Sequence, residues 1–264
     1  MQTWLSYHIY PLETPEVFLT RGVRPFLEQH VWPVKGARAF FIRYDDEKGQ
    51  HIRLRIRGEA GWLEQTLRPA FDAWFAERGA VDTMPYLPET ERFGGPETIG
   101  WAEEYFHLST RVVLDRMNGP YTYGDAMSAA LRLHAITAFA AGWNREKSAW
   151  YFNRLCDQWM DLFLKQEDTA GEDWKTNWKE LFENNFTPQR EELRLAMSEL
   201  WSAMEKGKFD QGQPEWLRWL RGSQMILPEF GEQLEKVLPS LLHLTNNRLG
   251  VNNQDEVYLN YLLS

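Results

Sequence analysis

The sequence contains only one cysteine, Cys156, among its 264 residues. A single cysteine cannot form a disulfide within the chain, and it excludes a zinc or redox site built on a Cys-x-x-Cys pair. The six histidines are dispersed as well, because no His-Glu-x-x-His pattern occurs and no two lie at the spacing of metal ligands. We therefore expect no metal site, and an inert buried thiol at Cys156.

Three patterns of common nucleotide-binding and catalytic sites are also missing, namely GxGxxG, GxxxxGK followed by Ser or Thr, and GxSxG. Their absence leaves nucleotide-binding and serine-hydrolase functions without support, and we expect no cofactor. No apolar run approaches the roughly 20 residues of a membrane helix, and Met1–Ser6 lacks the pattern of a secretion signal. These absences predict a soluble, cytoplasmic protein with no membrane partner.

Positive charge is in the minority, since 29 lysines and arginines stand against 38 aspartates and glutamates, a formal net charge of −9. Binding nucleic acid requires a broad basic surface, so we expect no direct nucleic-acid partner. The exception is local: in the segment His51–Arg57, HIRLRIR, arginines alternate with apolar residues. A period of two predicts a strand with one apolar and one basic face. Such a row of guanidinium groups indicates a site for a small anionic group.

The N-terminal part alternates between strand and helix patterns. Strands are expected at 3–10, 38–44, 51–57 and 81–86, and helices at 15–27 and 60–78. The order strand, helix, strand, strand, helix, strand predicts a ferredoxin-like split βαβ sheet with both helices on one face. Ile52, Leu54 and Ile56 are then expected to face the helices. Arg43, Arg53 and Arg55 are expected to lie together on the opposite face.

The rest of the chain has helical periodicity. Helices are expected at about 96–117, 125–141, 144–165, 173–184, 188–206, 214–222 and 228–245, and from 253 to the end, with an acidic loop at Glu167–Asp173. The 13 tryptophans are interpreted mainly as packing residues, with a peptide-binding groove as the alternative. The sequence thus predicts an α+β protein in which residues 1–95 and a larger helical part, 96–264, pack as one functional unit. The oligomeric state is left open.

Two further segments carry polar side chains suited to catalysis. Glu89 and Arg92 lie in PYLPETERFGG, residues 85–95, where they form either an ion pair around a turn or part of a site. His243 lies in LLHLTNNRLG, residues 241–250, at the end of a predicted helix. A histidine there is either a helix cap, favoured by the helix dipole, or a group that transfers a proton near neutral pH.

Taken together, FFIRYDD…GQHIRLRIRG, PYLPETERFGG and LLHLTNNRLG resemble the C-terminal glutamate-elimination domain of the class I lanthipeptide (lantibiotic) dehydratases. Domains of this family also occur as separate chains in thiopeptide and lanthipeptide gene clusters. The similarity covers the chain from Trp4 to its C-terminus. In the full-length family, a large N-terminal domain uses glutamyl-tRNA to esterify Ser and Thr of a precursor peptide. The elimination domain then removes glutamate and leaves dehydroalanine or dehydrobutyrine.

This resemblance implies a lyase of bacteriocin biosynthesis, a stand-alone glutamate eliminase acting on a ribosomal precursor peptide. The family's elimination residues match Arg53, Arg55, Glu89, Arg92 and His243 here, while Phe93 stands where the family usually has tyrosine. We assign to substrate binding the neighbouring residues Arg43, Arg57, Asn247 and Arg248. The implied partners are the precursor (leader–core) peptide and a separate glutamyl-tRNA-dependent glutamylation protein, because the glutamylating domain is absent from this sequence.

The residue types suit this chemistry independently of the resemblance. Eliminating glutamate from a Ser ester requires removal of an α-proton, stabilisation of an enolate-like oxygen and neutralisation of a departing carboxylate. We expect His243 to act as acid and base, and Arg55 with Arg92 to hold the carboxylate and the oxyanion. Glu89 either orients an arginine or acts as the base.

Two alternative functions stay open. Pyridine synthases of thiopeptide pathways resemble this fold and join two dehydroalanines by a formal [4+2] cycloaddition, but they generally lack the matched Arg, Glu and His set. A non-catalytic module that binds a leader peptide or a dehydratase partner is the other alternative. Because such a module would tolerate loss of His243 or Glu89, their presence favours elimination.

Overall fold

The structure is a computed structural model that describes residues 1–165, 173–209 and 213–264. Its helices and strands form two compact units, residues 1–122 with 229–250, and residues 123–228 with 251–264. This division does not follow the predicted boundary at Gly95, because two helices that come after Gly95 pack with the sheet of the first unit. The acidic loop predicted at Glu167–Asp173 lies outside the described residues, except for Asp173.

The first unit contains one antiparallel sheet in the order β2-β3-β1-β4. Its strands are β1 (Gln2–Pro11), β2 (Arg38–Asp46), β3 (Gly49–Glu59) and β4 (Gly79–Thr83). Two interrupted helices connect them: α1 (Pro15–Phe18), η1 (Leu19–Val23) and α2 (Arg24–His30), then α3 (Ala60–Trp62), η2 (Leu63–Leu67) and α4 (Arg68–Phe75). The prediction of a mixed α/β protein with an N-terminal sheet is confirmed.

One face of this sheet is apolar and packs against the interrupted helices. Tyr7 of β1 stacks on Phe71 of α4 with 3.7 Å between ring centroids, and Phe26 of α2 contacts Phe71 at 5.6 Å. The residues that were predicted to face the helices are fully buried in register with Ile9, Tyr7 and Leu5, namely Ile52, Leu54 and Ile56. Burying each such side chain stabilises the unit by roughly 1.5–3 kcal/mol.

The expectation that Arg43 shares a face with Arg53 is wrong. Arg43 pairs with Ile52 across the β2–β3 ladder, whereas Arg53 pairs with Ile42. Because successive residues of a strand point to opposite faces, the Arg43 side chain lies on the side of Ile52. The sequence misled here because Phe40, Phe41 and Ile42 are all apolar and give no alternation.

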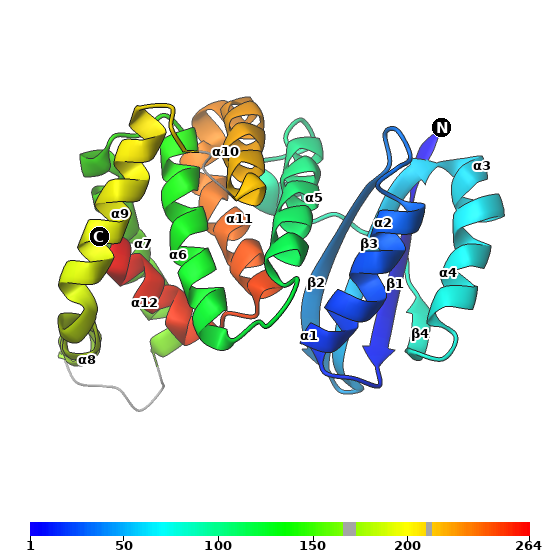
Figure 1. The fold of residues 1–264 in the computed structure, drawn as a ribbon, viewed down its shortest axis with the longest axis horizontal. Helices are drawn as coiled ribbons and strands as arrows, with labels where there is room; N and C mark the ends of the chain where they lie inside the picture. The colour runs from blue at the N-terminus through cyan, green and yellow to red at the C-terminus, as the bar shows by residue number, and fades with distance from the viewer. Residues whose placement is uncertain (166–172, 210–212) are drawn as a thin grey trace. The chain divides into compact units, whose positions relative to one another are not determined.

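Three helical segments complete the first unit around strand β2. They are η3 (Thr90–Phe93), α5 (Ile99–Arg116) and α11 (Leu234–Leu249), and α11 follows η6 (Leu227–Gln233). Helix α11 contacts α5, η3 and β2, and α5 runs beside β2 (Figure 1). Residues far apart in the sequence are thereby brought to one edge of the sheet.

Side chains from α5 and α11 cover the free edge of β2. Backbone N–H groups of the strand donate to side-chain acceptors in the pairs Ala39–His107 (3.1 Å), Phe41–Thr110 (3.3 Å) and Arg43–Asn247 (2.9 Å). The Asn247 amide also donates to the Arg43 carbonyl at 2.9 Å, as a neighbouring strand would. These bonds satisfy the edge, keep it from pairing with another chain, and attach α11 to the sheet.

The second unit consists of helices. They are α6 (Tyr123–Ala140), α7 (Arg145–Trp159), η4 (Met160–Leu164), α8 (Trp174–Phe186), η5 (Thr187–Gln189), α9 (Arg190–Glu205), α10 (Pro214–Ile226) and α12 (Asn253–Leu263). Asn144 caps α7, accepting from the Lys147 N–H at 2.8 Å. Helix α6 lies at the core, and its His134 is fully buried and stacks against Phe152.

The tryptophans of this unit mostly pack. Trp219 is completely buried and donates to Thr137 Oγ1 of α6 at 3.0 Å, whereas Trp150 is exposed. Cys156 is a buried free thiol, and burial raises its pKa to about 11. Among the described residues, none of the helices is long and apolar enough to cross a membrane.

Candidate functional site

The predicted strand of arginines forms one face of the sheet, which we call the arginine face: Arg53, Arg55 and Arg57 of β3. Their cross-strand partners on β1 are His8, Ser6 and Trp4, and on β2 they are Ile42, Phe40 and Arg38. The three guanidinium groups differ in their partners. Arg57 is paired with acids, whereas Arg53 and Arg55 form no ion pair with the described residues.

Arg57 is engaged by helix α5. Its Nη1 contacts Glu103 at 3.2 Å and its Nη2 contacts Glu104 at 2.7 Å, while Arg38 of β2 contacts the second carboxylate at 2.6 Å. Both acids therefore compensate the charge of Arg57. This predicted substrate-binding residue holds α5 to the sheet.

Arg55 has no carboxylate of its own. It makes no hydrogen bond to the residues that the structure describes, and its guanidinium lies over the rings of Tyr86 (4.8 Å) and Phe40 (5.4 Å). Burial lowers the pKa of Arg55, an effect that the nearby Tyr86, Glu89 and Glu103 oppose. A partly desolvated cation against aromatic rings binds an incoming anion more strongly than an exposed one does.

Arg248 of α11 lies close to Arg55 and is completely buried. Its Nη1 donates to the Leu244 carbonyl at 2.9 Å, but its Nε and Nη2 have no hydrogen-bond partner in the described part of the chain. The guanidinium lies 5.1 Å from the Phe106 ring and 5.9 Å from that of Phe40. Burial, together with the charge of Arg55, lowers its pKa to about 9, an effect that Tyr105 partly opposes.

The two arginines thus approach one aromatic ring, that of Phe40, without an acidic hydrogen-bond partner among the described residues. Burying an uncompensated cation is costly, and two like charges side by side add to this cost. A bound carboxylate would offset both terms, since guanidinium groups donate to carboxylates in a bidentate manner. The pair has the chemistry of a binding site for one anionic group.

The segment η3 brings Glu89 and Arg92 to this region. Arg92 Nη1 contacts Glu89 Oε2 at 2.8 Å, so the ion pair around the turn is present, and Arg92 Nε donates to Ser240 of α11 at 3.1 Å. Both side chains are exposed. Gly94 ends η3 with a φ of +89°, and a Cβ there would lie 2.8 Å from Thr98 Oγ1. The turn therefore requires glycine at this position.

His243 occupies the face of α11 that meets η3 and β2. It lies one turn after Ser240, which contacts Arg92, and one turn before Asn247, which bonds to β2. Its side chain is half-buried. Helix geometry therefore places the predicted acid–base residue between the Glu89–Arg92 pair and the sheet.

Arg43 and Asn247, in contrast, have structural partners. The Arg43 guanidinium contacts Glu16 of α1 at 2.5 Å and donates to the Arg248 carbonyl at 3.1 Å. Both residues line a cavity of about 420 Å³ beside Glu16 and Tyr44. The structure therefore brings together Arg53, Arg55, Glu89, Arg92, His243 and Arg248, and it leaves Arg43, Arg57 and Asn247 in supporting positions.

Sequence reasoning missed the Tyr86–Glu103 pair. Glu103 of α5 is only 8% exposed, and its burial raises the pKa of its carboxyl, which is hydrogen-bonded to Tyr86 and to Arg57. Tyr86 in turn lies beneath Arg55. Adjacent Glu103 and Glu104 are both polar in the sequence, and no periodic signal tells which of them is buried.

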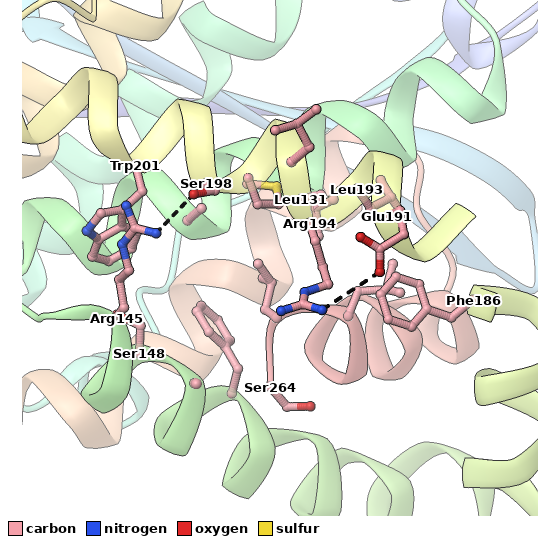
Figure 2. Close-up of a pocket in the computed structure, with 17 residues that line it drawn as sticks. Leu131, Arg145, Ser148, Phe186, Glu191, Leu193, Arg194, Ser198, Trp201 and Ser264 are labelled. Carbon is pink, nitrogen blue, oxygen red and sulfur yellow. Dashed lines mark hydrogen bonds and ion pairs between the residues drawn. The ribbon is translucent and has the colours of Figure 1, made fainter. Parts of the chain in front are cut away.

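A larger pocket of about 680 Å³ lies in the second unit, between α6, α7, α9 and the end of α12 (Figure 2). Its two arginines are already bonded, Arg145 to Ser198 at 3.2 Å and Arg194 to Glu191 at 3.8 Å. No predicted site residue lines it, and all of those residues lie in the described part of the chain. Nor does any group of three or more His, Cys, Asp or Glu side chains among the described residues form a metal site.

Comparison with known proteins connects this geometry to a family. The family described as "Lantibiotic biosynthesis dehydratase C-term" matches residues 4–264. No curated protein matches the sequence. Among solved structures, the chain is similar to the tRNA-dependent lantibiotic dehydratase MibB from Microbispora sp. 107891, with 20% identity and a TM-score of 0.64. That alignment covers 98% of this chain and 28% of MibB.

Two shorter proteins have similar folds. The pyridine synthase TbtD from thiomuracin biosynthesis has 16% identity and a TM-score of 0.73, over 98% of this chain and 96% of TbtD. TsrL has 16% identity and a TM-score of 0.56, over 100% of this chain and 93% of TsrL. At these identities the likeness establishes the fold alone. Any conclusion about function therefore has to rest on the arrangement of the charged residues.

Proposed function

Since the chain belongs to the lantibiotic dehydratase C-terminal family, we propose that it is a lyase that eliminates glutamate from glutamylated Ser and Thr residues of a ribosomal precursor peptide. The chain spans 28% of MibB, so this activity rests on the site and not on the whole dehydratase. The observation that carries the proposal is the pair of half-buried Arg55 and buried Arg248, which approaches Phe40 without an acidic partner in the described residues.

The reaction needs one anion site and one proton-transfer group. The Cα–H bond of the esterified residue breaks, a Cα=Cβ double bond forms, and the Cβ–O bond breaks, so that glutamate departs as a carboxylate. We assign the glutamyl carboxylates to Arg55 and Arg248, with Arg53 and Arg92 at the margins of the site. His243 removes the α-proton, and the arginines stabilise the developing enolate oxygen.

Glu89 is best suited to orienting Arg92, because its carboxylate already contacts that guanidinium at 2.8 Å. From the sequence we expected Arg55 and Arg92 to hold the carboxylate. We now assign this role mainly to Arg55 and Arg248. Arg92 then contributes from the exposed side of the site.

The partners follow from this chemistry. We propose that the chain acts on a precursor peptide together with an activity that attaches glutamate from glutamyl-tRNA, and that both of its units act in this one reaction. We also assign the sheet with its two interrupted helices to the ferredoxin-like arrangement. The order of its elements and the strand order β2-β3-β1-β4 support that assignment.

Mass spectrometry of a glutamylated precursor peptide tests the proposal. The protein should convert each glutamyl adduct to a product one water lighter than the unmodified peptide, with release of free glutamate. The His243→Ala variant should leave the adduct intact while retaining the native circular dichroism spectrum. Unchanged adducts with the wild-type protein would contradict the elimination function.

A pyridine synthase is the second candidate, because the alignment covers 96% of TbtD, a protein of about the same length. A peptide that already contains dehydroalanines distinguishes the two functions. Release of the leader with a new pyridine ring would favour the cycloaddition, whereas an unreacted dehydroalanine peptide together with glutamate release from the adduct would favour elimination. A cycloaddition also has no need of Arg55 and Arg248.

A further inference from the structure

His51 is a buried histidine that the proposed reaction does not use. It opens the HIRLRIR segment on β3, two residues before Arg53, and its side chain is 0% exposed. The burial of this histidine therefore has to be explained by contacts other than those of the reaction. Both of its ring nitrogens make such contacts.

The hydrogen bonds of His51 determine its tautomer. Arg53 Nε donates to His51 Nε2 at 3.2 Å, so Nε2 carries no proton and acts as an acceptor. The other nitrogen, Nδ1, lies 3.1 Å from the Gly49 carbonyl and donates to it. Gly49 has a φ of +107°, which the tight turn between β2 and β3 requires. The imidazole is therefore neutral and locked by the turn.

Arg53 is held from two directions. Its guanidinium lies 3.2 Å above the ring of Tyr44, and its Nε is bonded to His51. Neither Nη1 nor Nη2 of Arg53 has a hydrogen bond to the described residues, so the fork that binds carboxylates is available. An acidic partner would have neutralised the charge of Arg53, whereas a neutral imidazole orients the guanidinium and leaves its positive charge uncompensated.

The surroundings of His51 come from every neighbouring strand. His8 and Tyr10 of β1 lie 5.0 and 4.7 Å from its ring, and Tyr44 of β2 lies at 5.4 Å. The charged groups are Asp46 of β2, 3.8 Å from Nδ1, Asp82 of β4, and Arg53. Burial lowers the pKa of His8 to about 4, so the stacked neighbour is neutral as well. Lys48 lies over the Tyr10 ring at 5.7 Å and is paired with Asp82 at 2.6 Å, so its charge is already compensated.

We propose that His51 is a positioning residue that, as a neutral Nδ1–H tautomer, aims the terminal nitrogens of Arg53 at the anion site. The inference rests on the proposed elimination function for its role in turnover.

The test compares two substitutions in the full chain. His51→Leu keeps the approximate volume and removes the acceptor, whereas His51→Gln supplies an oxygen acceptor that does not titrate. His8→Phe is the matched control, because it retains the stacking and has no bond to Arg53. Glutamate release from a glutamylated precursor peptide is measured at pH 7, with kcat and KM determined separately.

His51→Leu should lower kcat/KM about tenfold, the effect expected of one lost hydrogen bond to a charged group. Combined with Arg53→Ala it should cost nothing further, since the two residues act as a unit. His51→Gln should keep most of the activity, because its side-chain oxygen replaces the lost acceptor. Additive losses, or a loss in His51→Gln as large as that in His51→Leu, would overturn the proposal.

A measurement without turnover separates this inference from the function itself. In ¹⁵N-labelled protein, the ring signals should report Nε2 as unprotonated and Nδ1 as protonated at pH 7, and the Arg53 Nε–H should exchange with water slowly. His51→Leu should abolish that slow exchange. If the wild type eliminates no glutamate but these signals are as described, the proposed function fails and the positioning of Arg53 stands. An Nε2–H tautomer would refute the positioning directly.

Discussion

Replacing Arg248 by methionine should make the protein more stable and the enzyme inactive. The side chain is completely buried, has one backbone hydrogen bond, and makes no contact with an acid among the described residues. Burial lowers its pKa from the ordinary arginine value to about 9, which corresponds to a desolvation cost on the order of 5 kcal/mol. Methionine has a similar length and carries no charge.

Part of that cost is already offset by the Leu244 carbonyl and the rings of Phe40 and Phe106. Replacement of buried ionic groups by apolar ones gains about 1–4 kcal/mol, and we expect about 2 kcal/mol here. For a chain of this size the Tm should rise by about 4–8 °C. The same change should lower kcat/KM at least about 100-fold, because a partner of the departing carboxylate is lost.

The assay pairs thermal and urea unfolding with glutamate release, for Arg248→Met and for the control Arg43→Met. Arg43 is neutralised by Glu16 at 2.5 Å, so its replacement should destabilise the protein. Free glutamate should stabilise the wild type, by about 1.4 kcal/mol at ten times its Kd, and should leave Arg248→Met unaffected. A destabilised Arg248→Met protein that glutamate protects as well as the wild type would show that Arg248 is a structural cation.

Two further changes test the frame of the site. Asn247→Leu removes both hydrogen bonds to the Arg43 backbone at the edge of β2. Urea unfolding should show that the free energy of unfolding falls by about 2–4 kcal/mol. An unchanged unfolding midpoint would mean that water replaces these bonds. Burial raises the pKa of Glu103 in the folded state. At a pH just above the ordinary carboxyl pKa, the folded protein therefore binds more protons than the unfolded protein. The stability of the folded protein should fall as the pH rises through this range. Glu103→Gln should flatten this part of the stability–pH curve, and an identical slope in the variant would assign it to another acid.

Several features of this protein follow from the sequence alone. Alternating residues in HIRLRIR determine that Ile52, Leu54 and Ile56 are buried while the arginines share the other face, since a strand has a period of two. The spacing of Glu89 and Arg92 determines their ion pair, because residues three apart around a helical turn are neighbours. Asn144 caps its helix for an equally local reason.

Only the tertiary structure decided which arginines have partners. Arg57 is neutralised by acids of α5, and Arg43 points away from the arginine face because its register is set by pairing with Ile52. Helix α11 returns to the sheet about 200 residues later, where Asn247 bonds to Arg43. The same return buries Arg248 beside Arg55, and burial turns a polar residue of a helix end into an uncompensated cation. Periodicity identifies the faces of helices and strands, but the charges that meet across them depend on long-range packing.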